Sequence, residues 1–172
     1  MEQISFLAFD LGATSGRSIL GTLRDGKLQM KELTRFPNQI LELGGHYYWN
    51  IFSLYEHLCE GLRAAAREGV EIASVGIDTW GVDYGLLDRN GHLLGNPRAY
   101  RCAVDEDFEE TWKIIDFPTL FARTGIANQN FNTVYQLYRR KLQDDPALAN
   151  AETLLFMPDL LGYFLTGEKK SE

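Results

Sequence analysis

The chain has 172 residues, of which 45% are hydrophobic and 24% are charged, a composition that is typical of a globular protein and excludes general disorder. This length fits one large domain with a sizeable core. The net charge of -7 argues against a nucleic acid or an anionic membrane as a partner, because no run of Lys and Arg offers a basic surface. An anionic ligand would therefore have to be bound by a small local group of donors and positive charges, not by a broad basic surface.

The cysteines and the N-terminal residues indicate the cellular compartment of the protein. Cys59 and Cys102 lie far apart and match no metal-binding pattern, which favours reduced thiols in a cytoplasmic protein. The first ten residues have no basic region and only a short apolar run, unlike a signal peptide or an anchor. No apolar stretch approaches the roughly 20 residues that span a bilayer. We therefore expect a cytoplasmic chain.

The first predicted elements are two antiparallel strands joined by a tight turn. An apolar run starts at Phe6 and ends at Asp10, a Gly-Ala-Thr-Ser-Gly segment follows, and a second apolar run extends from Ser18 to Leu23. Glycine in the turn permits unusual backbone conformations, so that several N–H groups could converge on one phosphate. An ordinary hairpin with glycine in its turn is the alternative.

The residues of this turn form a set suited to the phosphates of a nucleotide. They are Gly12, Ala13, Thr14, Ser15, Gly16 and Arg17. Backbone amides, hydroxyl groups and a guanidinium supply donors and positive charge, and Asp10 is placed to hold a hydrated Mg2+ beside the phosphates. The spacing matches neither a P-loop nor a dinucleotide-binding fingerprint.

A third strand and a helix follow. The turn at Asp25-Gly26 predicts a strand over residues 27–36, and a change in the parity of its apolar positions predicts a bulge or the end of the strand near Lys31-Glu32. Residues 36–49 contain Pro, Asn and two Gly, which predicts a loop. Apolar residues at helical spacing after Asn50 then predict a core-packing helix that ends near residue 68.

The strand predicted over residues 72–80 leads to a second group of candidate site residues. The preceding helix is long enough to return the chain beside the first strand, which would place Asp78 near Asp10. Ligands bind at the carboxyl ends of such strands. Gly81 would allow close approach of a ligand, Trp80 could wall a pocket, and Asp83 could accept hydrogen bonds from hydroxyl groups of a ligand. Alternatively, Gly81 only bends the chain and Trp80 fills the core.

The rest of the chain predicts a hairpin and several short helices. The hairpin covers residues 84–95 around an Asn-Gly turn. Arg98 and Arg101 then either reach carboxylates or a ligand, or form a surface pair. Helices are predicted at residues 118–124, 133–142, from Pro146 and at 159–165. The second of these has an apolar stripe, formed by Val134, Leu137, Tyr138 and Leu142.

Five stretches resemble one protein family in their order along the chain. They are residues 10–17 (DLGATSGR), 76–83 (GIDTWGVD), 97–101 (PRAYR), 131–137 (FNTVYQL) and 157–167 (MPDLLGYFLTG). The first resembles the phosphate-binding hairpin of the actin-like ATPase superfamily, which includes the FGGY carbohydrate kinases. The second resembles the sugar-side strand of the rhamnulokinases within that family. The family pattern often has an acidic residue after Tyr-Arg, where this chain has Cys102, so a sugar-side role at that position is in doubt.

The resemblance implies an α/β fold of the ribonuclease-H-like, actin-like ATPase type, with a mixed sheet whose first three strands are antiparallel and which is flanked by helices. Residues 1–172 would be a partial N-terminal FGGY kinase domain, and the C-terminal nucleotide-clamping domain would be absent. It implies Mg2+-assisted, ATP-dependent phosphorylation of L-rhamnulose to L-rhamnulose 1-phosphate. Asp10 would hold Mg2+ through water, and Asp78 would orient the site. The catalytic base would be an Asp beyond residue 172, and the isolated chain would be inactive.

Three alternatives remain open from the sequence. The substrate could be another ketose or polyol of the same kinase family. Asp10, Asp78 and Asp83 could instead form a two-metal nuclease site of the ribonuclease H type, although the acidic charge and the turn after Asp10 argue against it. A sugar-binding module without catalysis is the third alternative.

Overall fold

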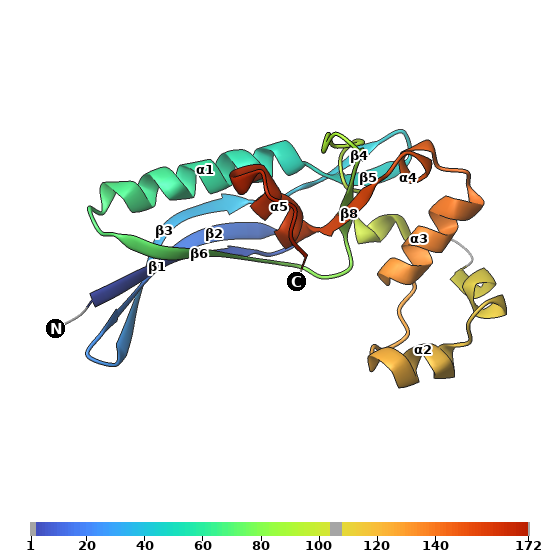
Figure 1. Ribbon diagram of the computed structural model, residues 1–172, viewed down its shortest axis with the longest axis horizontal. Coiled ribbons are helices and arrows are strands. Elements are labelled where there is room, and N and C mark those ends of the chain that lie inside the picture. The colour runs from blue at the N-terminus through green and yellow to red at the C-terminus, as the bar shows by residue number, and fades with distance from the viewer. Residues whose placement is uncertain (1–2, 104–107, 172) are drawn as a thin grey trace. The chain divides into compact units, whose positions relative to one another are not determined.

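The computed structural model describes residues 3–103 and 108–171 (Figure 1). The chain forms two compact units. The first contains the chain up to Leu41, residues Asn50–Gly81 and the chain from Leu155, whereas the second contains Glu42–Trp49 and Val82–Leu154. All of the predicted phosphate-side residues, Asp10 and 12–17, therefore belong to the first unit.

The first unit is built on a four-stranded mixed sheet in the order β3-β2-β1-β6. The strands are β1 (Gln3–Leu11), β2 (Ser15–Arg24), β3 (Lys27–Pro37) and β6 (Ile72–Thr79). The first three pair in antiparallel fashion, and β6 runs parallel to β1. This arrangement confirms the predicted fold class. The register also confirms the bulge, because Ile19 pairs with Glu32 whereas Ser18 pairs with Thr34.

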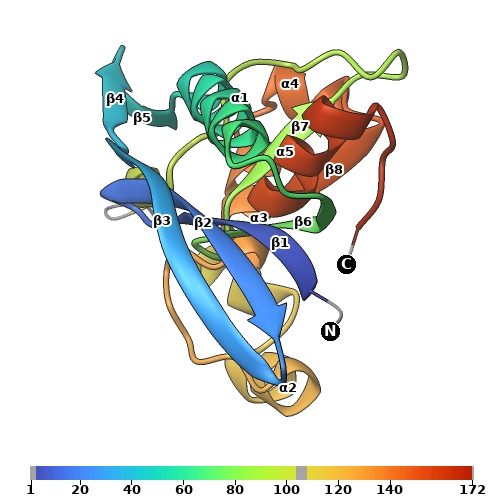
Figure 2. The same ribbon diagram turned by 90° about the vertical axis from the view of Figure 1, so that its left-hand side faces the viewer.

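Helix α1 (Ile51–Arg67) covers one face of this sheet, and α5 (Met157–Thr166) lies on the same face (Figures 1 and 2). The Asn50 side chain caps α1 by accepting a hydrogen bond from the amide of Ser53, as the sequence predicts. Gly61 brings α1 close to the sheet, since a Cβ there would lie 2.5 Å from a ring carbon of Phe9. The face buried under these helices forms the core of the first unit, with Leu7, Phe9, Leu11, Leu54 and Leu58 among its buried residues.

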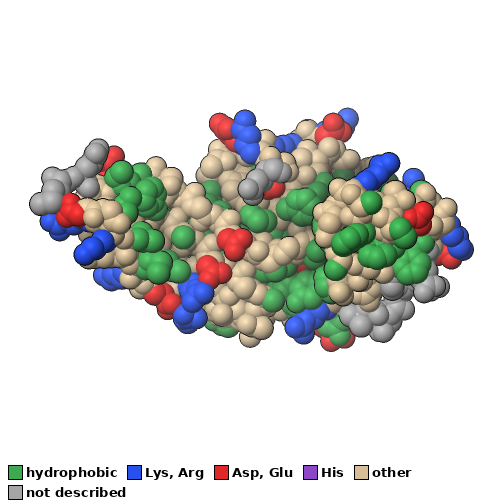
Figure 3. All heavy atoms as spheres, turned by 90° about the horizontal axis from the view of Figure 1, so that it is seen from below, with side chains coloured by type: hydrophobic (Ala, Val, Ile, Leu, Met, Phe, Trp, Pro, Cys, Tyr) green, Lys and Arg blue, Asp and Glu red, His purple; other side chains and the backbone are tan. Residues whose placement is uncertain are grey.

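The opposite face of the sheet carries exposed hydrophobic side chains (Figure 3). Ile4, Leu23 and Leu28 are register partners across β1, β2 and β3, and their exposed fractions are 37%, 37% and 59%. Met30 on β3 is 73% exposed. An apolar row of this kind is unusual for a sheet that is complete by itself.

The predicted loop at residues 36–49 is wrong in part, because the structure forms a short hairpin there. Its strands are β4 (Ile40–Leu43) and β5 (His46–Trp49). Gly44 and Gly45 connect them with φ values of 61° and 78°. Two adjacent residues with positive φ are what a tight hairpin turn requires, and the Gly-Gly pair supplies them. A loop prediction based on the presence of glycine alone does not reveal this hairpin.

The second unit contains the predicted hairpin and short helices. Strand β7 (Tyr84–Leu87) forms a bridge between Leu87 and Leu93 and pairs with β8 (Thr153–Phe156). The helical elements are η1 (Tyr100–Ala103), η2 (Phe108–Lys113), α2 (Phe117–Thr124), α3 (Thr133–Leu142) and α4 (Pro146–Ala149). Within the described residues, no helix has both the length and the apolar character needed to cross a bilayer.

The predicted apolar stripe on α3 is wrong. Val134 and Leu142 are 38% and 55% exposed, whereas Tyr135 and Gln136 are buried. The hydroxyl of Tyr135 donates to Asn128 and accepts from the indole N–H of Trp112. Polar contacts therefore decide which face of α3 is buried, and a count of apolar positions could not reveal this.

Candidate functional site

The turn between β1 and β2 closes on itself through a backbone hydrogen bond. The amide of Gly12 donates to the carbonyl of Ser15 at 2.9 Å, so this amide is not available to a ligand. A Cβ on Gly12 would lie only 3.1 Å from the same carbonyl oxygen. The close approach of two backbone segments, rather than an unusual φ, therefore requires glycine at position 12.

Gly16 is also required by space rather than by its φ. A Cβ at this position would lie 2.3 Å from a ring carbon of Phe36 and 3.0 Å from Leu11. Neither Gly12 nor Gly16 has a positive φ. The expectation that both glycines adopt conformations barred to other residues is thus wrong, although both positions exclude a side chain.

Donor groups remain on the turn for a ligand. In the described part of the chain, the amides of Ala13 and Thr14 have no hydrogen-bond acceptor. Thr14 is exposed and Ser15 is half-buried, so their hydroxyl groups can be reached from solvent. Two amides and two hydroxyl groups on three adjacent residues form a donor set that suits an oxyanion.

Arg17 and Asp10 are register partners on β2 and β1, and their side chains form an ion pair. The Nε of Arg17 lies 2.8 Å from the Oδ2 of Asp10. Both side chains are partly exposed, at 41% and 42%. The guanidinium and the carboxylate predicted to face a nucleotide and its metal ion are thus paired with one another.

Asp78 lies beside Asp10, as the sequence predicts. The two residues are register partners on the parallel strands β1 and β6. The turn after β1 and residues Trp80-Gly81 after β6 therefore leave the sheet at the same edge, where the carboxyl ends of the strands meet. Asp78 is exposed and Trp80 is half-buried. Gly81 is exposed, and a Cβ there would meet nothing within 4 Å, so that packing does not require a glycine at this position.

The next residue, Val82, has a φ of 69°. A β-branched residue rarely adopts this conformation, which costs on the order of 1–3 kcal/mol and persists only when its surroundings enforce it. The carbonyl of Val82 accepts hydrogen bonds from the Thr133 hydroxyl at 2.8 Å and the Gln136 amide at 3.3 Å. These contacts from α3 hold the strained residue, and no local pattern around Val82 indicates its conformation.

Asp83 is buried in the second unit, with an exposed fraction of 1%. Its carboxylate accepts hydrogen bonds from the Trp49 indole at 2.6 Å, the Gln136 side chain at 3.0 Å and the Tyr100 amide at 3.1 Å. A buried carboxylate needs several donors of this kind to remain charged. Asp83 thus organises the backbone after Gly81, a role that the sequence did not predict, and direct contact with a sugar stays a prediction.

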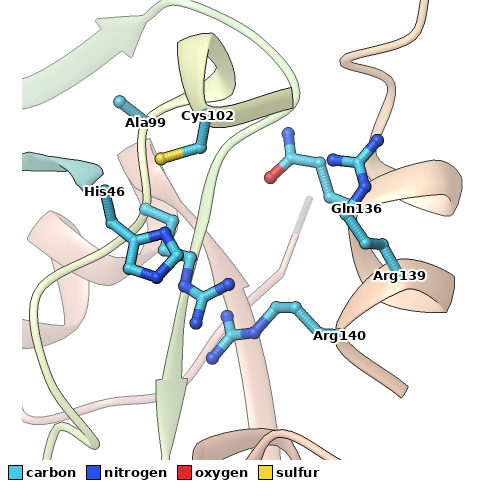
Figure 4. A pocket seen from close by; sticks show the side chains of 7 residues that line it. His46, Ala99, Cys102, Gln136, Arg139 and Arg140 are labelled. Carbon is cyan, nitrogen blue, oxygen red and sulfur yellow. The ribbon is translucent and has the colours of Figure 1, made fainter. Parts of the chain in front are cut away.

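Arg98 contacts a carboxylate, as one of the two alternatives for this residue predicts, rather than forming a surface pair with Arg101. Its guanidinium lies 3.1 Å from the Oδ2 of Asp145, and Arg140 lies 2.8 Å from the same oxygen. These arginines line a cavity of about 20 Å³ in the second unit, where His46 and Arg140 point toward a common space (Figure 4). This is room for about one water molecule. Arg101 is exposed.

Cys102 has a structural role next to this cavity. Its sulfur accepts a hydrogen bond from the amide of Tyr47 at 2.8 Å, and its thiol donates to the carbonyl of the same residue at 3.2 Å. Among the described residues, neither Cys59 nor Cys102 forms a disulfide. The thiol of Cys102 thus joins η1 to β5 at the position where the family pattern often has an acid.

The described residues contain no group of three or more His, Cys, Asp or Glu side chains able to hold a metal ion directly. The burial of Asp83 under three hydrogen-bond donors argues against the two-metal nuclease alternative, which needs this carboxylate at the metals. Asp10 and Asp78 at one sheet edge do fit an Mg2+ ion that keeps its water shell, since Mg2+ is commonly held by one or two carboxylates together with substrate phosphates.

Comparison with known proteins identifies close relatives by sequence. The chain is 47% identical over 169 residues to a rhamnulokinase from Bacteroides thetaiotaomicron, and the match covers 98% of this chain and 35% of the relative. It is 40% identical over 173 residues to a rhamnulokinase from Oceanobacillus iheyensis, and this match covers 100% of this chain and 37% of the relative. The chain therefore spans about a third of the length of these curated relatives.

Solved structures show the same fold at low sequence identity. A gluconate kinase from Lactobacillus acidophilus matches with a TM-score of 0.80 at 13% identity, covering 98% of this chain and 34% of that chain. A xylulose kinase from Rhodospirillum rubrum matches with a TM-score of 0.79 at 18% identity, covering 98% and 36%. The family model described as "FGGY family of carbohydrate kinases, N-terminal domain" matches residues 5–172. The chain belongs to the FGGY family of carbohydrate kinases.

Proposed function

We propose that this chain is the sugar-side part of a kinase that transfers a phosphoryl group from ATP to the 1-hydroxyl of L-rhamnulose, giving L-rhamnulose 1-phosphate. The observation that carries the proposal is the 47% identity to a rhamnulokinase over 98% of the chain. Because the chain spans about a third of that relative, the activity is proposed for a longer polypeptide that contains it.

In this proposal the turn from Gly12 to Arg17 binds the phosphates of ATP. The amides of Ala13 and Thr14 and the hydroxyls of Thr14 and Ser15 donate to phosphate oxygens. Arg17 exchanges its partner, leaving Asp10 for the more highly charged phosphate group. Phosphoryl transfer depends on positioning and on neutralising charge, and these groups supply both.

Asp10 would hold Mg2+ through water, with Asp78 beside it. When bound, the ion would supply positive charge that offsets the negative charge of the phosphates. The partly exposed carboxylate of Asp10 becomes available for this role as Arg17 turns to the phosphate. Asp78, on the neighbouring strand, orients the water shell at the same edge of the sheet.

The sugar would bind against Trp80 and Gly81. The open space around Gly81 leaves room for a substrate next to the backbone. Trp80 offers a face on which a sugar can stack. Asp78 and Asp83 complete the predicted sugar side. Because Asp83 also accepts hydrogen bonds from Trp49 and Gln136, it supports the Val82 backbone next to the substrate.

The catalytic base would be an Asp beyond residue 172, in a C-terminal nucleotide-clamping domain, and residues 1–172 would be a partial N-terminal domain. The exposed apolar row on the sheet supports this domain assignment, since further chain would cover it. Without the base and the clamp, the isolated chain should not turn over substrate. The reduced state of both cysteines is consistent with a cytoplasmic location, which we include in the proposal.

A chimera tests this function. The chain would replace the matching third of the Bacteroides thetaiotaomicron rhamnulokinase, and ADP release would be measured with L-rhamnulose, with D-xylulose and with D-gluconate. The proposal requires ATP- and Mg2+-dependent turnover that is highest with L-rhamnulose. A folded, ATP-binding chimera that prefers either of the other substrates would contradict the assignment of substrate. The isolated chain serves as the inactive control.

A further inference from the structure

Asn38 lies directly behind the turn that joins β1 and β2, although it is far from it in sequence. The Nδ2 of Asn38 donates to the carbonyl of Gly12 at 2.8 Å, and its backbone amide donates to the carbonyl of Thr14 at 2.9 Å. The residue is buried, with an exposed fraction of 8%. A single residue thus holds two of the carbonyl groups of the turn.

These two bonds set the direction of the amides that follow. In a trans peptide unit the C=O and the next N–H point in opposite directions within one plane. Holding the carbonyl of Gly12 therefore turns the N–H of Ala13 away from Asn38. The bond to Thr14 does the same for the N–H of Ser15. Asn38 thus fixes the orientation of the Ala13 amide, one of the donors that the turn leaves for a ligand, without contacting the ligand itself.

We propose that Asn38 is a positioning residue for phosphate binding, which keeps the amide of Ala13 directed at the phosphate before the nucleotide arrives. This inference rests on the proposed role of the turn. A turn ordered in advance avoids the entropy loss of ordering it on binding, which strengthens binding without any added contact.

The side chain of Asn38 is specific for this task. An Asp has the same shape but no N–H to donate, and its negative charge would repel the Gly12 carbonyl and the phosphates. An Ala keeps the backbone bond to Thr14 and loses only the side-chain bond. Asn38→Ala and Asn38→Asp thus separate loss of the bond from added repulsion.

Asn50 provides a matched control. It lines the same cavity of about 180 Å³ as Asn38, but its side chain caps α1 through the amide of Ser53 and does not touch the turn. Asn50→Ala should lower the thermal midpoint, as loss of a helix cap does, and should leave the turn unchanged. A general loss of stability is thereby distinguished from loss of positioning.

The first measurement is 15N relaxation of the ligand-free 172-residue chain. We expect backbone order parameters near 0.85 for residues 12–15 in the wild type and in Asn50→Ala, and values below about 0.6 in Asn38→Ala. A turn that stays equally rigid in Asn38→Ala overturns the inference. This result does not depend on whether the chain binds a nucleotide.

The second measurement is an NMR titration of the same variants with Mg-ATP. Asn38→Ala should raise the dissociation constant about tenfold, the effect of losing one positioning hydrogen bond, and Asn38→Asp should raise it further. Asn50→Ala should bind like the wild type. If the wild type binds Mg-ATP and Asn38→Ala binds it with the same affinity, the inference is overturned. A wild type that fails to bind contradicts the proposed function, and the relaxation result then decides the role of Asn38 by itself.

Discussion

Arg17 and Asp10 face one another across β1 and β2, with the Arg17 Nε 2.8 Å from the carboxylate of Asp10. Both side chains are more than 40% exposed, and an ion pair of this kind contributes at most about 1 kcal/mol. The pair is therefore weak enough to open when a more highly charged phosphate is offered. Opening it would supply a cation for the phosphate and a carboxylate for hydrated Mg2+ in one step.

Arg17→Gln should weaken binding of Mg-ATP at least tenfold, because a charge-assisted hydrogen bond to phosphate is lost. The free energy of unfolding should change by less than about 1 kcal/mol, as expected for an exposed pair. Titration and urea unfolding of the chain would measure both. Arg24→Gln, on the same strand and with 59% of its side chain exposed, is the matched control. Equal weakening by both substitutions would show that only overall charge matters.

Gly16→Ala should lower the free energy of unfolding by about 1–3 kcal/mol, because the new methyl group would overlap the ring of Phe36 at 2.3 Å. Gly76→Ala is the control, since a Cβ there meets nothing within 4 Å on the same sheet. Urea unfolding would compare the two. If Gly16→Ala is as stable as Gly76→Ala, the packing of Phe36 over the turn is not what requires this glycine.

The sequence was sufficient for the sheet of the first unit because each of its strands shows a local pattern. The apolar runs on both sides of the glycine-containing turn, the Asp-Gly turn and the helical spacing after Asn50 predict three antiparallel strands and a returning fourth. Asp78 beside Asp10 follows from that topology. The hairpin at Gly44-Gly45 was missed because its strands are only four residues long.

Much of the support around the site could not be predicted, since it depends on contacts between distant residues. Nothing near Asn38 in sequence indicates that it holds Gly12, 26 residues away. The strained φ of Val82 is enforced from α3, about 50 residues further along the chain. Asp83 looked like a ligand contact because carboxylates commonly bind sugars, whereas its burial under three donors becomes visible only in three dimensions.

Val82→Gly should leave the free energy of unfolding unchanged or raise it by up to about 1 kcal/mol. Removing the Cβ relieves strain at a φ of 69°, which offsets the greater entropy of glycine in the unfolded chain. Val75→Gly is the control, because Val75 lies in β6 with ordinary strand geometry, and this change should lower stability by about 1 kcal/mol. Similar losses in both variants, measured by urea unfolding, would show that Val82 is not strained.

Asp145→Asn should make the chain less stable at neutral pH by about 2 kcal/mol, because it removes the charge shared by Arg98 and Arg140. Burial alone would raise the pKa of Asp145, but the hydrogen bond and charge of Arg140, with the amides of Ala147 and Leu148, lower its pKa below the usual value. The stabilisation is therefore fully present above about pH 4, the unfolded pKa, and is lost as the pH falls through the lower folded pKa.

Unfolding of the wild type and of Asp145→Asn between pH 7 and pH 2 measures this dependence. The difference in stability between them should be constant above about pH 4 and should shrink below it. Asp144→Asn, at an exposed neighbouring position, is the matched control for the loss of a carboxylate from this segment. A difference for Asp145→Asn that persists at pH 2 would mean that the ionised carboxylate is not what stabilises this unit.

The most direct test of the central claim is to map ligand binding on the 15N-labelled chain with Mg-ATP and L-rhamnulose, added separately and then together. We predict that Mg-ATP shifts the amide signals of residues 10–17 and that L-rhamnulose shifts those of residues 78–83. Each ligand should leave the signals of the other set unchanged. Saturable shifts confined to other parts of the chain, or none in residues 10–17 at millimolar Mg-ATP, would contradict the assignment of this turn to ATP phosphates.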